Sequence, residues 1–170
     1  MDDMMRLLKR LNDSGVEFVL IGGMAAIVHG GSIVTDDVDV CVHFNLDTIT
    51  KILKALDGLN PKHRMRPDHM RLSEDPAMFE HFKNLYVTCD LGVIDFLGEL
   101  PLFGSFDDVL RNSTSMNLSG FACRVLNAHV LMDVKRAVGR EKDLRVVKEL
   151  EGLLWLQRKE PPKAKPTDET

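Results

Sequence analysis

The most constraining feature of the sequence is a short apolar run that two aspartates interrupt, Asp37-Val38-Asp39-Val40-Cys41-Val42. Alternate residues of a β-strand share one face, so Asp37 and Asp39 would point one way while the valines face a core. Adjacent carboxylates repel each other, and strands disfavour aspartate. A divalent cation such as Mg²⁺, which prefers carboxylate oxygens, is the simplest compensating charge. The alternative is an edge strand whose polar face meets water.

A strand–Gly-Gly–helix pattern precedes these aspartates. Residues 16–21 form a β-rich apolar run that predicts a buried strand, and residues 24–29 predict a short helix. Gly22 and Gly23 stand between them, where glycine allows a sharp turn and the close approach of a ligand. The beginning of a helix favours phosphate, because its N–H groups are unpaired and its dipole is positive there. A purely structural turn is the alternative.

A third aspartate, Asp95, lies in the strongly apolar run Val93-Ile94-Asp95-Phe96-Leu97. Burial of an unpaired charge is costly, so this carboxylate needs a partner. It either joins Asp37 and Asp39 around a metal or forms a salt bridge with an Arg or Lys of residues 58–83. That polar segment has no clear periodicity. Its basic cluster, residues 63–71, is either a polar loop or a rim for an acceptor such as RNA.

The remaining pattern alternates helical and β-rich segments. Helical spacing is present in residues 4–11, 45–56, 127–138 and 144–154, and we expect Asn45 and Asn127 to cap the second and third of these helices. β-rich runs are present in residues 85–88, 93–97 and 121–126. This order predicts an α+β fold with a small mixed β-sheet, flanking helices and a C-terminal helical segment. We expect residues 1–156 to form one domain, and the Pro- and Lys-rich residues 157–170 to be disordered.

Composition excludes several classes of protein. The chain has 170 residues, 44% hydrophobic and 28% charged, as expected for one globular domain. Its net charge of −4 argues against a surface that coats nucleic acid, although a local basic groove is compatible with it. The three cysteines include no CxxC pair, and no signal peptide or membrane-spanning run is present, so we expect a cytoplasmic protein without membrane contact. Histidine spacings typical of zinc sites are absent.

Taken together, the motifs resemble the nucleotidyltransferase fold, the superfamily typified by DNA polymerase beta. The shared pattern is Gly-Gly, thirteen intervening residues, Asp-x-Asp on a strand, and a distant strand aspartate. Residues 18–30 and 34–39 further resemble small bacterial stand-alone nucleotidyltransferase-like proteins related to abortive-infection toxins of the AbiE type. Residues 88–99 and 133–144 also resemble that group. The similarity extends over residues 4–154.

The resemblance implies an enzyme that transfers a nucleoside monophosphate from an NTP such as ATP to an acceptor hydroxyl. The acceptor would be RNA (for example tRNA), a protein or a small molecule, and the chain would have a partner protein if it belongs to a toxin–antitoxin pair. The carboxylates implied to hold Mg²⁺ or Mn²⁺ are Asp37, Asp39 and Asp95, of which Asp95 also helps to deprotonate the hydroxyl. The residues implied to bind the nucleotide are Gly22, Gly23, Lys135 and Arg140, with support from Lys142 and Asp143. For the last four, a solvated helix face is the alternative.

One position departs from the group. Many members carry an Arg shortly before the Thr that precedes the paired aspartates, where this chain has Ile33. If that Arg holds phosphate, its loss favours a second hypothesis. The chain would then be a catalytically idle module that binds a nucleotide or a protein, as an antitoxin does.

Overall fold

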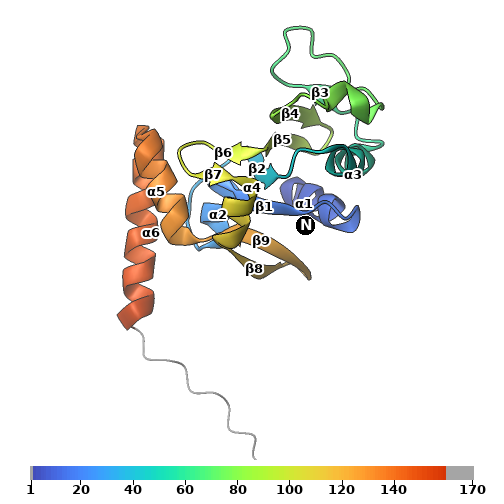
Figure 1. Ribbon diagram of the computed structural model, residues 1–170. Helices are drawn as coiled ribbons and strands as arrows, with labels where there is room; N and C mark the ends of the chain where they lie inside the picture. Colours follow the sequence, from blue (N-terminus) through green and yellow to red (C-terminus); the bar gives the residue numbers. More distant parts are fainter. Residues whose placement is uncertain (1, 160–170) are drawn as a thin grey trace, which may run out of the picture.

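Seven strands form one mixed sheet in the order β3-β4-β5-β2-β1-β9-β8 in the computed structural model, which describes residues 2–159 (Figure 1). The strands are β1 (Phe18–Ile21), β2 (Asp37–Val42), β3 (Lys62–His63), β4 (Asn84–Cys89), β5 (Gly92–Leu97), β8 (Ser113–Leu118) and β9 (Phe121–Leu126). A separate two-stranded sheet consists of β6 (Glu99–Leu100) and β7 (Gly104–Ser105). The predicted α+β class with a mixed sheet is therefore confirmed.

The central strands explain the apolar runs of the sequence. Strand β1 is buried along its whole length, because it lies between β2, to which it is antiparallel, and β9, to which it is parallel. Strand β2 pairs on its other side with β5 in parallel. Its Val38 and Val40 are fully buried, whereas Asp37 and Asp39 are half-buried. Since β2 is an interior strand, the alternative of an edge strand with a solvated polar face is wrong.

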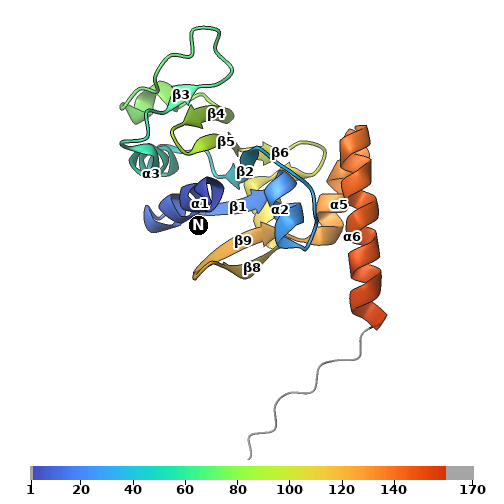
Figure 2. The ribbon, with the colours of Figure 1, turned by 180° about the vertical axis from the view of Figure 1, so that it is seen from behind.

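Helices flank this sheet. They are α1 (Asp3–Asp13), α2 (Gly22–Val28), α3 (Leu46–Leu56), the 3-10 helix η1 (Pro76–Phe79), α4 (Phe106–Arg111), α5 (Ala128–Val138) and α6 (Glu141–Lys159). Helices α1 and α3 lie side by side, and α5 and α6 form a second pair at the opposite end of the molecule (Figures 1 and 2). The buried apolar side chains from both ends belong to one continuous core cluster.

Local capping chemistry sets several of the helix boundaries. As predicted, Asn45 caps α3, where its side-chain oxygen accepts a hydrogen bond from the Thr48 N–H at 2.8 Å. Gly139 ends α5 in a left-handed conformation, with φ of 72°. Asn127 precedes α5 as expected but does not cap it, because its Oδ1 accepts a hydrogen bond from Oγ1 of Thr114 instead.

The structure differs from the predicted elements in several places. Helix α2 begins at Gly22 rather than after the glycines. Helix α4 and strands β6, β7 and β8 were not predicted, and neither were the short β3 and η1 within the unassigned residues 58–83. Helix α6 continues through Lys159, into the segment expected to be disordered, and the rest of that segment, 160–170, lies outside the described residues. Within residues 2–159, no helix has both the length and the hydropathy needed to cross a bilayer.

Candidate metal and nucleotide site

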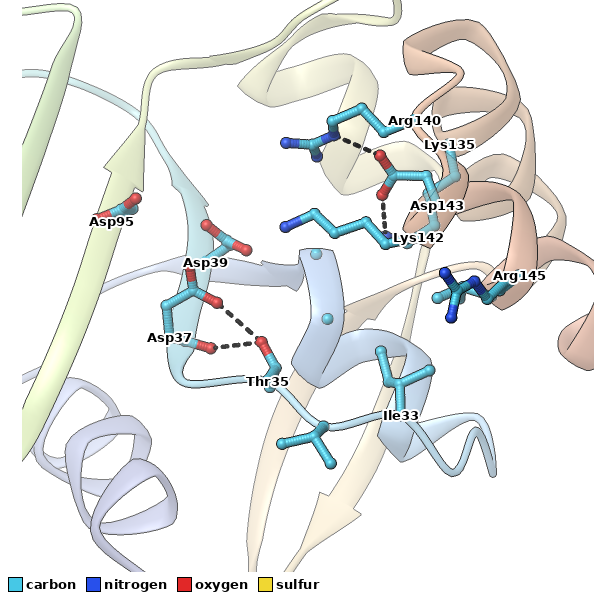
Figure 3. Close-up of a pocket in the computed structure, with 14 residues that line it drawn as sticks. Ile33, Thr35, Asp37, Asp39, Asp95, Lys135, Arg140, Lys142, Asp143 and Arg145 are labelled. Carbon is cyan, nitrogen blue, oxygen red and sulfur yellow. Dashed lines mark hydrogen bonds and ion pairs between the residues drawn. The ribbon is translucent and has the colours of Figure 1, made fainter.

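The three predicted carboxylates lie together at one end of the β2–β5 pair. Asp39 and Asp95 are register partners on these parallel strands, and Asp37 precedes Asp39 on the same face of β2. One carboxylate oxygen from each residue lies within 4.8 Å of the other two (Figure 3). Three hard oxygen donors at this spacing form a suitable ligand set for Mg²⁺ or Mn²⁺.

Gly22 and Gly23 lie directly against the beginning of β2 and the residues that precede it. Gly22 has φ of +65°, and a Cβ atom added to it would lie 2.1 Å from Oδ2 of Asp39. A Cβ atom on Gly23 would lie 2.6 Å from Oγ1 of Thr35. The Thr35 hydroxyl in turn donates a hydrogen bond to Oδ1 of Asp37 at 2.8 Å. The glycines therefore allow the start of α2 to approach the aspartates, which is more than a structural turn requires.

Burial and mutual repulsion make the carboxylates costly to ionise without a cation. Burial, together with the neighbouring charges of Asp37 and Asp95, raises the pKa of Asp39 to about 6. Burial also raises the pKa of Asp95, although a hydrogen bond from Arg64 opposes this shift. The charge of the cluster is therefore only partly compensated by the surrounding protein.

Arg64 is the protein's own counter-charge to Asp95. Its guanidinium hydrogen-bonds to Oδ2 of Asp95 and lies over the ring of Tyr86, 5.7 Å from the centroid. The predicted alternative of a salt bridge from residues 58–83 is therefore present. It leaves Oδ1 of Asp95 buried and without a hydrogen-bond partner. Such an orphaned carboxylate oxygen beside two further aspartates fits a metal ligand, so the salt bridge and a metal site are compatible.

Four basic side chains on or next to α5 and α6, those of Lys135, Arg140, Lys142 and Arg145, face the carboxylates and form a cationic wall. Two of them are held by Asp143, whose side chain is only 4% exposed. It accepts hydrogen bonds from Nζ of Lys135 at 2.9 Å and Nε of Arg140 at 2.6 Å. Burial opposes ionisation of Asp143, but these two hydrogen bonds outweigh it and lower the pKa of the carboxyl. Asp143 therefore stays ionised and fixes both cations at the edge of the site.

A cavity of about 510 Å³ separates the carboxylates from the cationic wall. Figure 3 shows Arg140 and Lys142 extending from the α6 side toward the aspartates. Arg145 also lines the cavity, beside Ile33. The cavity thus has carboxylates on one side and four basic side chains, those of Lys135, Arg140, Lys142 and Arg145, on the other. This polarity matches a metal cation bound to a polyphosphate.

The structure brings together every residue predicted for the site. The seven that line the cavity are Gly22, Gly23, Asp37, Asp39, Asp95, Lys135 and Arg140. Their roles as metal or nucleotide ligands stay predictions. The basic cluster 63–71 does not line the cavity, and only its Arg64 reaches a site residue.

Sequence reasoning missed two residues of the site, Thr35 and Arg145, and predicted Arg64 only as an unspecified Arg or Lys of residues 58–83. Thr35 precedes the paired aspartates and could have been found as a local hydroxyl donor to Asp37. Arg145 lies three residues beyond Lys142, and that helical spacing places both on the cavity side of α6. Arg64 has no such signal, because its contact with Asp95 spans 31 residues.

Comparison with known proteins agrees with this geometry at the level of the fold. No protein-family model and no curated protein sequence matches the chain. Among solved structures, the chain is similar to a "putative nucleotidyltransferase" from Thermotoga maritima, with a TM-score of 0.52 and 15% sequence identity over 89% of each chain. This similarity supports a nucleotidyltransferase-like fold, which agrees with the fold class predicted from the sequence.

Proposed function

We propose that the chain is a Mg²⁺- or Mn²⁺-dependent nucleotidyltransferase that transfers a nucleoside monophosphate from an NTP to an acceptor hydroxyl. The observation that carries this proposal is the convergence of three carboxylate oxygens within 4.8 Å, opposite a wall of basic side chains. Asp37, Asp39 and Asp95 would hold the metal, which supplies charge neutralisation at the reacting phosphate. The resemblance of the sequence to AbiE-type toxins favours, within this proposal, a small stand-alone nucleotidyltransferase-like protein of the bacterial type.

In the proposed reaction, the acceptor oxygen attacks the α-phosphorus and pyrophosphate leaves. Asp95 is the proposed acceptor of the hydroxyl proton, the role that the sequence resemblance implies for it. Lys135 and Arg140, held by Asp143, neutralise charge on the triphosphate. The close approach of Gly22 to Asp39 brings the start of α2 next to the same phosphates.

In this proposal, Arg145 replaces the Arg that related proteins carry at the position of Ile33. Both residues line the cavity, so a guanidinium is present beside position 33 although it comes from α6. Among the described residues, Arg145 pairs only with Glu141, at 2.7 Å on an exposed surface, and such pairs exchange readily for a stronger anion. We therefore assign the phosphate contact to Arg145 and not to a residue of the loop before β2.

The acceptor classes we propose are RNA (including tRNA), a protein side chain or a small molecule. A role as one component of a toxin–antitoxin pair, with a partner protein, follows from the sequence resemblance alone. A polar acceptor would approach Asp95 from the side of β4, where Arg64 and Tyr86 border the carboxylate.

The Arg64–Asp95 salt bridge favours one alternative function. A guanidinium that already neutralises Asp95 is what a catalytically idle module would retain if its metal site were no longer in use. Such a module would bind a nucleotide or a protein partner through the cationic wall without turnover. The orphaned Oδ1 of Asp95 is the observation against this alternative.

A transfer assay with labelled NTPs distinguishes the proposed enzyme from the catalytically idle module. The chain is incubated with Mg²⁺, total RNA, cell lysate and each α-labelled NTP in turn, beside the variants Asp37→Asn and Asp36→Asn. Asp36 is exposed and lies next to the triad without belonging to it, so its variant changes the charge equally. The proposal expects label in an acceptor with the parent and Asp36→Asn, and none with Asp37→Asn. No transfer with any NTP supports the idle module.

A further inference from the structure

A second, smaller cavity adjoins the candidate site. It has a volume of about 220 Å³ and lies between the strand ends of the sheet, α5 and the residues after β5. Ligand pockets for whole drug-sized molecules have roughly 300–1,000 Å³, so this cavity suits one part of a larger ligand.

The two cavities share a wall. Gly22, Asp39, Lys135, Arg140 and Asp143 line both of them. These are the residues that border the proposed metal and phosphate positions. A group covalently attached to a phosphate at this position would therefore lie close to the second cavity.

The chemistry of the second cavity differs sharply from that of the first. Beyond the shared wall, its lining is apolar and includes Leu97, Leu100, Leu126, Leu131, Val134 and Val138. The polar side chains that line the cavity, those of Asp39, Lys135, Arg140 and Asp143, all belong to the shared wall, where Asp143 accepts hydrogen bonds from Lys135 and Arg140. Among the described lining residues beyond that wall, no polar side chain is present to hydrogen-bond the edge of a base.

We propose that this apolar cavity receives the nucleobase of the NTP, and receives all four bases with little discrimination. The inference rests on the proposed function, because the triphosphate must occupy the neighbouring cavity. A flat base gains affinity from burial of its faces. Apolar pockets reject a wrong group weakly, by about 10- to 200-fold at most, whereas pockets that hydrogen-bond their ligand reject it far more strongly.

The test compares two probes, ATP and inorganic tripolyphosphate, each titrated calorimetrically into the full chain with Mg²⁺. We expect ATP to bind at least about tenfold more tightly than tripolyphosphate, because only ATP fills the second cavity. Dissociation constants for ATP, GTP, CTP and UTP should agree within about tenfold.

Two variants fill the cavity while leaving the phosphate position intact. Val134→Trp places an indole ring on the half-buried lining of the cavity. Val138→Trp places one at its rim, where Val138 is 43% exposed and a larger residue is tolerated. Each should reduce the ratio of ATP to tripolyphosphate affinity to near one without weakening tripolyphosphate. Leu156→Trp is the matched control, because Leu156 is exposed on α6 and does not line this cavity; it should keep the parental ratio.

The contrary outcomes separate this inference from the proposed function. If tripolyphosphate binds but ATP binds no more tightly, or if both filling variants keep the parental ratio, the second cavity does not hold the base. A preference of more than about 100-fold for one NTP also overturns the lack of discrimination. If neither probe binds the parent in the presence of Mg²⁺, the proposed function itself fails.

Discussion

Gly22 and Asp39 are in such close contact that any side chain at position 22 would displace the Asp39 carboxylate. A Cβ atom there would lie 2.1 Å from Oδ2 of Asp39, and the backbone φ of +65° independently favours glycine. The glycine thus links the beginning of α2 to the carboxylate cluster. Its exchange should affect both the fold and metal binding.

We predict that Gly22→Ala lowers the free energy of unfolding by about 1–3 kcal/mol, because of the positive φ and the displaced Asp39 carboxylate. It should also abolish any increase in melting temperature that Mg²⁺ gives the parent. Denaturant unfolding and melting curves with and without Mg²⁺ measure both effects. The control is Gly152→Ala on α6, where the new Cβ meets nothing within 4 Å and helix propensity should improve. A Gly22→Ala chain that Mg²⁺ still protects would contradict the coupling.

Asp39 should give the metal-free protein an unusual dependence on pH. Its folded-state pKa of about 6 is higher than the ordinary value of 3.8, so between these values the folded chain keeps a proton that the unfolded chain loses. The free energy of unfolding therefore falls as pH rises from about 4 to about 6, by about 1–3 kcal/mol, and then levels off.

Asp39→Asn isolates this contribution from the other carboxylates. The difference between parent and Asp39→Asn, measured by urea unfolding in EDTA, should grow over that pH range in favour of the variant. With Mg²⁺ present the trend should reverse for the parent, because the metal binds the ionised carboxylate. A difference independent of pH would show that Asp39 is not buried among like charges.

The Arg64–Asp95 salt bridge predicts competition with the metal. Arg64→Gln removes a cation that neutralises Asp95, so the metal-free protein should become less stable while Mg²⁺ binds about three- to tenfold more tightly. Calorimetric titration of Mg²⁺ measures the affinity. Arg66→Gln is the control, because Arg66 pairs with the exposed Asp68 and does not contact the triad. Unchanged Mg²⁺ affinity in Arg64→Gln would argue that Asp95 is not a ligand.

Asp143 should matter more for stability than any exposed carboxylate. Asp143→Asn leaves Lys135, only 12% exposed, without its counter-charge, and should cost about 2–4 kcal/mol near neutral pH. Because the folded pKa of Asp143 is lowered, this contribution is present above the ordinary value of 3.8 and lost as pH falls through the folded value. Glu141→Gln, in an exposed pair, should change stability little. Equal effects of the two variants in urea unfolding would contradict the assignment.

Sequence reasoning predicted the elements whose signals are local. The run around Asp37 and Asp39, the β-rich run that contains Asp95 and the cap at Asn45 each depend on residues a few positions apart. Strand β8 has no such signal, because its inner residues are exposed or half-buried, all except Met116 are polar, and no alternation of polar and apolar residues results. Helix α4 is only six residues long, too short for helical periodicity.

The geometry of the site depends on contacts that are distant in sequence. Three aspartates were predicted to converge, but the register that pairs Asp39 with Asp95 arises from a parallel contact between β2 and β5. Arg64 was predicted only as any Arg or Lys of a polar segment, because β3 is two residues long and has no periodicity. The second cavity was not predicted at all, since Leu97 and Val134 meet only in the folded chain.

Direct titration of Mn²⁺, followed by electron paramagnetic resonance, tests the central claim. The account predicts that the parent and Asp36→Asn bind the ion, whereas Asp37→Asn, Asp39→Asn and Asp95→Asn each lose at least about tenfold in affinity. Mg²⁺ should displace the bound Mn²⁺. No binding by the parent, or equal binding by Asp36→Asn and the three triad variants, would contradict a metal site at Asp37, Asp39 and Asp95.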